Sequence, residues 1–417
     1  MAGPGLHPHG MRPGTRVDGG LGRRLRRRGA RRGVGGEAAS ATGAADLTRR
    51  SLRVALVVER SAPGSGGVEN VAWQVASRLA LAGDRVTVIA RSGEAPPGST
   101  LLRVTSPSGW APLRVVAFSR AAARASKGFD VVQTFSRTRH QDVFRAGGGC
   151  HGDYLERMHG ARAAALRRLS PRHAVQLAIE RGVFGDPHQI VLCNSSFVRD
   201  AIAARYGVAP ERFSVIRNGV DLDRFHPERR AREGARLRAE LGAGGRTLWL
   251  FAGSGFPRKG LGTALGALAA SRDRDAWLVV AGRDDPAPWQ PMVRRLALEE
   301  RVRFVGPRAD PEALYAAADA LVLPTRYDAF ANVCLEASAA GIPVVTSGAN
   351  GAAEIVRETG IVVEDAEDVG AFARALEAFA DPRARHAAGL AGRALAERHG
   401  WDSHVEALRA LHARIAV

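Results

Sequence analysis

Short apolar runs alternate with longer amphipathic stretches along the chain, in a pattern that predicts parallel sheet. The first apolar run covers 52–58 and is followed by a glycine-rich loop, by a helical pattern over 68–81 and by a second apolar run over 85–90. A strand, a glycine-rich turn, a helix and a further strand in this order predict a βαβ unit. The parallel sheet that such units build needs helices on both faces.

The same alternation continues along the rest of the chain and predicts two α/β domains. Further strands are predicted at 101–105, 129–135, 189–194 and 213–217, and, after a polar stretch over 226–245, at 247–253, 276–282, 301–306, 320–324, 343–347 and 360–363. We therefore expect two facing Rossmann-like, doubly wound domains (51–222 and 246–400), a hinge region over 223–245 and a C-terminal helix over 401–417. Ligands of such domains bind at the carboxyl ends of the strands, which predicts a site in an interdomain cleft.

The net charge of +18 is unevenly distributed, because residues 1–50 carry eleven arginines against three acidic residues. This segment is rich in glycine and alanine and poor in aromatic residues, which predicts a disordered basic arm; a non-native extension from an upstream start codon is the alternative. No apolar segment follows the arginines over 23–32, as an export signal would require. No run reaches the roughly 18 residues of a membrane-spanning helix. We therefore expect a cytoplasmic protein.

The three cysteines, Cys150, Cys193 and Cys334, lie far apart and in no spacing typical of a metal site or a disulfide framework. Cys150 precedes a histidine in a glycine-rich segment, so a nucleophilic role has to be weighed against a small buried side chain, and we expect the second. The basic surplus beyond residue 50 favours anionic partners, although a solvated basic surface is the alternative. No signature of a specific nucleic-acid-binding motif is present.

The residues at 251–261 read Phe-Ala-Gly-Ser-Gly-Phe-Pro-Arg-Lys-Gly-Leu and join a predicted buried strand to a helix. Gly253 and its neighbouring glycine permit a close approach of the backbone to a ligand. Arg258 and Lys259 place two cations at the start of the helix. This combination predicts a diphosphate site, and solvated charges at a helix start are the alternative.

A second motif covers 324–337 and places Asp328 in a loop after a strand. We expect a helix to begin near Ala331, so that the amides of Ala331, Asn332 and Val333 are unpaired donors suited to a phosphate. Glu336 follows in this helix within an apolar run and needs a polar partner if it is buried. The hydroxyls of a ribose would serve, because a carboxylate can accept two hydrogen bonds from a diol.

Together these motifs resemble those of family 4 of the retaining glycosyltransferases, from about residue 52 to the end of the chain. The run over 253–260 and the segment Asn350-Gly-Ala-Ala-Glu354 are most similar to the glucosyltransferases of lipopolysaccharide core assembly. The resemblance implies the GT-B fold of two facing Rossmann-like domains. It also implies a nucleotide sugar as co-substrate, with UDP-glucose the expected donor, and no separate cofactor.

The resemblance also implies roles for single residues of the second domain. Arg258 and Lys259 would bind the donor diphosphate, and Glu336 would hold the ribose. Asp328 takes the first acidic position of the family's paired-carboxylate motif, near the hydroxyls of the donor sugar. Many relatives have Glu at this position, and the shorter Asp side chain retains the charge.

In the first domain, Gly66 and Gly67 match the family's glycine-rich loop, which approaches the donor phosphates and the acceptor. His151, in the segment Gly-Gly-Gly-Cys-His-Gly-Asp, resembles the cleft histidine near the transferred sugar. A hydrogen-bonded structural histidine is the alternative for His151. For Glu69 we expect a first-turn acid that complements the helix dipole.

Two Asp-x-Asp sequences, at 221–223 and 273–275, match the motif through which many other glycosyltransferases hold a metal ion. Neither adjoins Arg258 and Lys259 in the sequence. We therefore predict a metal-independent reaction, because cations and helix dipoles can also stabilise a departing diphosphate.

The sequence thus predicts transfer of a hexose, with retention of anomeric configuration, to a hydroxyl of a cell-surface glycan such as lipopolysaccharide core. The rival functions are another GT-B hexosyl- or N-acetylhexosaminyltransferase and, in a different class, a basic protein that binds anionic surfaces or nucleic acid. If the acceptor is lipid-linked, a predicted helical segment over 161–181 with interleaved arginines could lie on the anionic inner face of the plasma membrane. A solvated charged face is the alternative.

Overall fold

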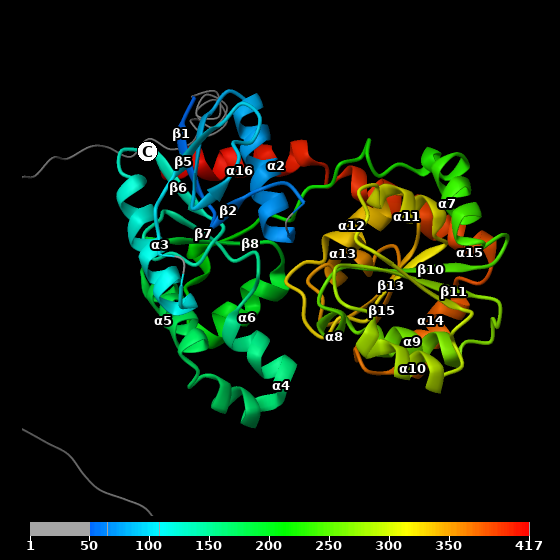
Figure 1. Ribbon diagram of the computed structural model, residues 1–417. Coiled ribbons are helices and arrows are strands. Elements are labelled where there is room, and N and C mark those ends of the chain that lie inside the picture. The colour runs from blue at the N-terminus through cyan, green and yellow to red at the C-terminus, as the bar shows by residue number, and fades with distance from the viewer. Residues whose placement is uncertain (1–50, 65, 108, 417) are drawn as a thin grey trace, which may run out of the picture. The chain divides into compact units, whose positions relative to one another are not determined.

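The computed structural model of this protein describes residues 51–64, 66–107 and 109–416, so the predicted arm over 1–50 lies outside the described residues. Two parallel sheets, of seven and six strands, form its framework (Figure 1). The predicted α/β class with two parallel sheets is therefore confirmed. Helices cover both sheets, as parallel strands require.

The first sheet has the strand order β5-β3-β1-β6-β7-β8-β9, and all of its pairs are parallel. Its strands are β1 (Arg53–Val57), β3 (Arg85–Ala90), β5 (Thr100–Arg103), β6 (Val131–Thr134), β7 (Val143–Arg145), β8 (Ile190–Cys193) and β9 (Phe213–Val215). All except β7 overlap predicted strands. The connecting helices are α2 (Gly67–Leu81), α3 (Ala111–Ala125), α4 (His151–Arg167), α5 (Pro171–Gly185) and α6 (Ser196–Tyr206), and the short strands β2 (Arg60–Ser61) and β4 (Ser92–Gly93) pair separately.

The second sheet has the order β12-β11-β10-β13-β14-β15, and each of its strands overlaps a predicted one. Its strands are β10 (Leu248–Ala252), β11 (Trp277–Ala281), β12 (Val302–Gly306), β13 (Ala320–Leu323), β14 (Val344–Ser347) and β15 (Ile361–Val363). Its helices are α7 (Glu233–Leu241), α8 (Phe256–Lys259), α9 (Leu261–Ala270), α10 (Gln290–Arg295), α11 (Pro311–Ala317), α12 (Asn332–Ala339), α13 (Ala353–Val356), α14 (Val369–Ala378) and α15 (Pro382–Glu397).

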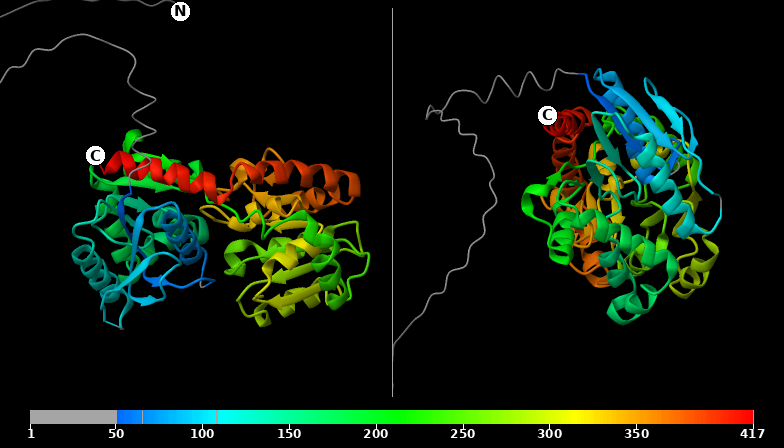
Figure 2. Two further views of the ribbon diagram at one scale, coloured as in Figure 1. Left: turned by 90° about the horizontal axis from the view of Figure 1, so that it is seen from above. Right: turned by 90° about the vertical axis from the view of Figure 1, so that its left-hand side faces the viewer.

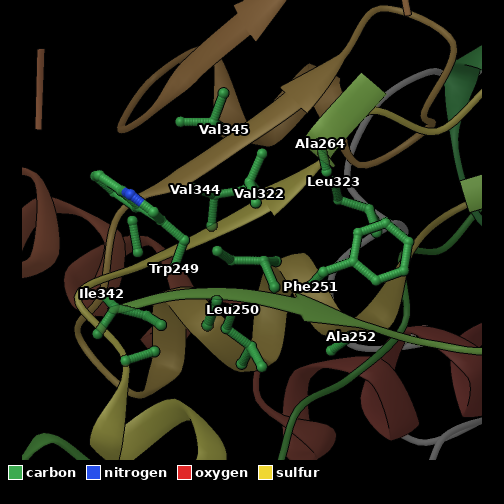
Figure 3. Packing of buried hydrophobic residues seen from close by; sticks show 14 of the residues in the cluster. Trp249, Leu250, Phe251, Ala252, Ala264, Val322, Leu323, Ile342, Val344 and Val345 are labelled. Atoms are coloured by element: carbon green, nitrogen blue, oxygen red, sulfur yellow. The ribbon is translucent and has the colours of Figure 1, made fainter. Parts of the chain in front are cut away.

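The core of the second sheet explains why its strands read as continuous apolar runs. Every residue of β10 is buried, and Trp249 and Phe251 belong to one cluster with Val322 of the adjacent strand β13 and Val344 of β14 (Figure 3). Side chains of this size each contribute about 1.5–3 kcal/mol when fully buried. The strand ends that carry the loops of a ligand site are thereby held in fixed positions.

The C-terminal helix α16 (Trp401–Ile415) packs on the core of the first sheet, although the second sheet precedes it in sequence (Figure 2). Trp401, Leu408 and Leu411 belong to the same buried cluster as Val75 of α2. The chain returns beside the segment that left the first sheet, where Val220 forms a parallel bridge with Gly400. Helix α16 lies within the segment 401–417, for which the sequence predicts a C-terminal helix.

The segment over 161–181 differs from its prediction, because it is not one helix. The chain leaves helical geometry at Gly160, where φ is 74°, and α4 ends before Pro171 begins α5. Proline at the first helical position suits a new helix and does not suit the middle of an old one. The apolar side chains of α5, among them Leu177 and Ile179, are buried, so this part of the predicted membrane-facing surface faces the protein instead.

The polar stretch over 223–245 is largely helical. A 3-10 turn (Pro227–Ala231) and α7 pack against α11, and Leu237 is buried in the core of the second sheet. A hinge at this position stays a prediction. In the described part of the chain, no helix combines the length and the apolar character that crossing a membrane requires.

Candidate active site

A cavity of about 950 Å³ lies among loops at the carboxyl ends of both sheets. Its volume is in the range of sites for small ligands. Every residue that the sequence predicts to bind the donor lines it: Gly66, Gly67, Gly253, Arg258, Lys259, Asp328, Ala331, Asn332, Val333 and Glu336. His151 does not line this cavity. The structure thus brings together the motifs of both predicted domains, with that one exception.

Glycines shape the turn that carries Arg258 and Lys259. Gly253, with φ of 126°, lies against the Lys259 side chain, and a Cβ at this position would be 3.2 Å from the lysine Cε. Gly255 and Gly260 also have positive φ values and bound the short helix α8. A side chain at Gly260 would clash with the carbonyl of Pro324, so this glycine lets the two motif loops approach each other.

Asp328 pairs with both cations of this turn. Its Oδ2 accepts from Arg258 Nη1 at 2.8 Å and from Lys259 Nζ at 2.7 Å, while Arg258 also donates to the Tyr327 carbonyl at 2.9 Å. Burial opposes ionisation of Asp328, but the two cations outweigh it, so the pKa of this carboxyl lies below its ordinary value. Two cations against one carboxylate leave positive charge for an anionic ligand.

Helix α12 begins at Asn332, close to the predicted start, but one of its expected free donors is engaged. The amide of Ala331 donates to Oδ1 of Asn350 at 3.1 Å, which corrects the prediction that this amide is unpaired. Asn350 thereby ties the loop to the neighbouring segment, where it also forms a bridge with Asp328. Of the three amides predicted to donate to a phosphate, those of Asn332 and Val333 remain as candidates.

Glu336 is held in the cavity wall by a tyrosine. The hydroxyl of Tyr315, on α11, donates to Glu336 Oε2 at 2.5 Å. Burial raises the pKa of Glu336, and this hydrogen bond works in the opposite direction. Among the described residues, no group donates to the second oxygen, Oε1, so it can accept from a ribose hydroxyl.

His151 begins α4 and is surrounded by protein groups. Its amide donates to Glu180 at 2.8 Å, its Nε2 lies 2.9 Å from Nδ1 of His173, and its ring stacks with those of His173 and Tyr154. Burial, together with the charge of Arg137, lowers the pKa of His151 to about 3. The histidine is therefore neutral, and the alternative of a structural histidine accounts for all of these contacts.

The glycine-rich loop of the first sheet leads into α2. Gly66 is the residue before the helix, and a Cβ there would lie 2.5 Å from Oε2 of Glu69. Glu69 thus folds back over the first turn, in agreement with the expected dipole-complementing acid. Cys150 is buried, which raises the pKa of its thiol to about 11, so it is unsuited to act as a nucleophile.

Three further residues at the cavity, Arg145, Asn218 and Tyr327, are not among those predicted from the sequence. Arg145 ends β7, and a three-residue strand is too short to show in the apolar pattern, so its place at the sheet edge was not visible. Asn218 donates to Oδ1 of Asn332 at 2.6 Å. The hydroxyl of Tyr327 accepts from the amide of Cys150 at 3.0 Å. The last two contacts join segments more than 100 residues apart, and no local signal predicts them.

The two Asp-x-Asp sequences lie in different places. Asp221 lines the cavity, and its Oδ1 accepts from the amide of Arg224 at 3.0 Å. Asp273 and Asp275 lie in the turn before β11, and neither lines the cavity. The described residues include no group of three or more His, Cys, Asp or Glu side chains that could hold a metal ion. Independence from metal stays a prediction.

Several known proteins of similar sequence are glycosyltransferases. The chain is 28% identical over 303 residues to the lipopolysaccharide glucosyltransferase WaaG of Escherichia coli. The matched region covers 70% of this chain and 80% of that enzyme. It is 34% identical over 268 residues to a GDP-mannose-dependent alpha-(1-6)-phosphatidylinositol monomannoside mannosyltransferase of Mycobacterium tuberculosis, across 58% of this chain and 68% of that enzyme.

Solved structures show the same arrangement of two sheets. The crystal structure of WaaG, a glycosyltransferase involved in lipopolysaccharide biosynthesis, superposes with a TM-score of 0.75 at 26% identity, over 87% of this chain and 99% of that one. The sucrose-phosphate synthase of Thermosynechococcus elongatus, at 22% identity and a TM-score of 0.71 over 87% of this chain and 98% of that one, supports the fold alone.

Two family models match consecutive parts of the chain. Residues 65–224 match the model described as Glycosyltransferase Family 4, and residues 246–381 match the one described as Glycosyl transferases group 1. The two matches fall on the first and second sheets, and they confirm the resemblance seen in the motifs. The chain belongs to the family 4 glycosyltransferases and has the two parallel α/β sheets of the GT-B fold.

Proposed function

We propose that this glycosyltransferase moves glucose from UDP-glucose to a hydroxyl of a cell-surface glycan such as lipopolysaccharide core, with retention of configuration. The observation that carries the proposal is the convergence of Arg258, Lys259, Asp328 and Glu336 in one cavity. The similarity to a lipopolysaccharide glucosyltransferase supports the choice of donor and acceptor.

The donor would bind along the wall formed by the second sheet's loops. Its diphosphate would lie near the guanidinium of Arg258 and the ammonium of Lys259, beside the amides of Asn332 and Val333 at the start of α12. Its ribose would donate to Glu336. Fixed cations at the leaving diphosphate stabilise the charge that grows on it in the transition state, without reorganisation of solvent.

Asp328 is poorly suited to act as a nucleophile. Its Oδ2 accepts from both cations, and its Oδ1 accepts from the amide of Phe330 at 3.2 Å. Both oxygens are therefore engaged, and attack on the sugar would break this pairing. We propose instead that the acceptor hydroxyl attacks on the face from which the diphosphate departs. The bond between the sugar and the diphosphate breaks, and a departing phosphate oxygen accepts the hydroxyl proton.

Transfer assays with labelled nucleotide sugars test this function. UDP-glucose, UDP-galactose, UDP-N-acetylglucosamine and GDP-mannose would be offered with core-glycan and lipid-linked acceptors, and the anomeric configuration of the product would be determined by NMR. We expect the highest kcat/KM with UDP-glucose and an α-linked product. Preference for GDP-mannose would replace the donor assignment and would agree with the similarity to the mannosyltransferase. An inverted product would contradict the mechanism.

Independence from metal is tested in the same assay. We expect activity to persist in excess chelator, because Arg258 and Lys259 supply the positive charge at the diphosphate. Loss of activity on chelation, with rescue by Mg²⁺ or Mn²⁺, would contradict this part of the proposal. Asp221 in the cavity wall would then be the first metal ligand to test.

We also propose that the protein is cytoplasmic and binds peripherally to an anionic membrane, where a lipid-linked acceptor is found. The part of the predicted segment that supports this is the junction of α4 and α5. Leu166 and Leu169 are 72% and 79% exposed there, and Arg162, Arg167 and Arg172 are exposed around them. Apolar side chains ringed by arginines suit an anionic bilayer surface, where each cation contributes about 1 kcal/mol.

Sedimentation with phosphatidylglycerol vesicles tests the membrane proposal. The double variant Leu166→Ser, Leu169→Ser should sediment less than the wild-type chain at low salt, while Leu390→Ser, which removes an exposed leucine of α15, should behave as wild type. The wild-type chain and Leu390→Ser should both bind less of the vesicles at about 0.5 M salt, where the Debye length is roughly 4 Å. Equal sedimentation of wild type and double variant would exclude the junction as the docking surface.

A further inference from the structure

Arg145 is a buried arginine at the end of β7 whose charge is not compensated. The residue is 5% exposed, and it lines the cavity. Its Nη2 donates to Oδ1 of Asn218, and its guanidinium carbon lies 5.4 Å from the ring centroid of Phe135. Both partners are neutral. They hold the guanidinium in place without balancing its charge.

Arg258 and Lys259, in the cavity wall formed by the second sheet's loops, have a counterion that Arg145 lacks. Arg258 and Lys259 share the carboxylate of Asp328, whereas no carboxylate in the described part of the chain forms an ion pair with Arg145. Burial lowers the pKa of Arg145 to about 10, so the guanidinium remains protonated at neutral pH. A buried charge without a counterion costs free energy in the folded protein, and this cost is offset when a ligand supplies the counterion.

The glycine beside Arg145 leaves room for its guanidinium at the cavity wall. Gly147 and Gly148 line the cavity, and a Cβ on Gly147 would clash with Nη1 of Arg145. Neither Nη1 nor Nε of Arg145 donates to a side chain or carbonyl among the described residues. A planar guanidinium with open N–H groups, fixed by a neutral partner, matches the oxygens of a phosphoryl group better than a flexible ammonium does.

We propose that Arg145 binds a phosphoryl group in the cavity, from the side of the first sheet. The proposal rests on the proposed function, since the phosphoryl group would belong to a substrate of the transfer reaction. Either the donor diphosphate or a phosphate carried by the acceptor can supply it. Arg258 and Lys259 share one carboxylate, that of Asp328, and Arg145 adds a further cation to the cavity wall for an anionic substrate.

Calorimetry on the full-length chain tests the proposal. Wild type and Arg145→Gln would be titrated with UDP and GDP, and then, when saturated with the tighter of the two, with inorganic phosphate. The control is Arg212→Gln, because Arg212 is also partly buried beside the first sheet but donates to the carbonyls of Val183, Phe184 and Gln189 and does not line the cavity.

Suppose that Arg145→Gln binds the diphosphates at least tenfold more weakly than wild type and that Arg212→Gln does not. This result would support the proposal and would show that Arg145 binds the donor. Unchanged diphosphate binding with a tenfold loss of phosphate binding to the loaded protein would support it and assign Arg145 to the acceptor. Equal binding of both probes by wild type and Arg145→Gln would overturn the proposal alone. A wild-type chain that binds neither diphosphate would overturn the proposed function with it.

The stability of the ligand-free chain gives a second readout. Arg145→Met replaces the buried charge with an apolar side chain of similar length, and the relief of this charge opposes the loss of the donor to Asn218 Oδ1, so its Tm should stay close to that of wild type. Arg212→Met should lower Tm, because it leaves backbone carbonyls without donors. A Tm of Arg145→Met that falls as far as that of Arg212→Met would show that Arg145 is a structural arginine and would overturn the proposal.

Discussion

The two walls of the cavity differ in how fully their polar groups are paired. In the wall formed by the second sheet's loops, Arg258 and Lys259 share Asp328, and Glu336 is held by Tyr315. The wall formed by the first sheet's loops combines glycine-rich loops (Gly66, Gly67, Gly147 and Gly148) with uncharged side chains such as Asn70, Gln74 and Tyr154, and its Arg145 is a cation that lacks a carboxylate partner.

This difference suggests that the second sheet's wall binds the donor and that the first sheet's wall binds the acceptor. A paired, buried network holds its groups in fixed positions before a substrate arrives, which suits the diphosphate and ribose that all donors of one nucleotide share. Glycine-rich loops have more backbone freedom than such a network, which suits the recognition of varied acceptors. Damage to the second wall should therefore reduce turnover of every donor and acceptor pair.

The largest effect is expected from Lys259→Ala. Turnover should fall by a factor of about 100 or more, because loss of one fixed contact to developing charge typically costs about 3 kcal/mol. Asp328 keeps Arg258 as a partner, so the variant should still fold. Steady-state kinetics at saturating donor, beside the exposed-lysine control Lys127→Ala, provides the measurement. Wild-type turnover in Lys259→Ala would remove this residue from the site.

Glu336→Gln should have a smaller effect, concentrated in donor binding. The amide keeps the shape of the side chain but replaces a charge-assisted hydrogen bond to the ribose by a neutral one, so donor affinity should fall by about tenfold. Calorimetry with the nucleoside diphosphate measures it. Glu377→Gln is a suitable control, because Glu377 is a half-buried carboxylate of α14 away from the cavity. Equal affinities for Glu336→Gln and wild type would exclude the ribose contact.

Tyr315→Phe tests whether the pairing within the second wall matters. The variant removes the donor to Glu336 Oε2 and leaves the carboxylate free to rotate, so KM for the donor should rise by a few fold while kcat changes little. Tyr206→Phe is the matched control, because the Tyr206 hydroxyl donates to Glu180 and the residue does not line the cavity. If both variants change KM equally, the orientation of Glu336 by Tyr315 has no part in donor binding.

The smallest expected effect concerns His151 and pH. Its pKa is about 3 in the folded protein, where burial and the charge of Arg137 disfavour the charged form, against about 6.5 when unfolded. The unfolded chain therefore binds an extra proton between these values, and the stabilisation that is complete above about pH 6.5 is lost as the pH falls towards 3. Tm should thus fall less steeply in His151→Gln than in wild type between about pH 7 and pH 5. Identical slopes would contradict the buried, neutral histidine.

The sequence predicted the second wall well because its chemistry is local. Arg258 and Lys259 are adjacent, and Asp328 and Glu336 fall within one loop and helix, so the motifs carry their own geometry. The contact of Ala331 with Asn350 was not predictable in the same way, since it joins two loops. Most strands were found because parallel strands are buried on both faces and read as apolar runs.

The first wall was predicted less well for the opposite reason. Strand β7 is three residues long and gives no usable period, so Arg145 could not be placed at a sheet edge. His151 stands in a glycine-rich segment that resembles a ligand loop, but its surroundings come from α5, more than 20 residues further along the chain. Burial and pairing of this kind depend on tertiary contacts.

The claim that the donor binds to the second sheet's wall is tested most directly by a crystal structure of the full-length chain with the nucleoside diphosphate of its best donor. We predict phosphate oxygens within hydrogen-bonding distance of Arg258 and Lys259, and ribose hydroxyls within hydrogen-bonding distance of Glu336. A diphosphate that reaches the protein through a metal ion, or that contacts the first wall while Arg258 and Lys259 remain paired with Asp328 alone, would contradict this claim.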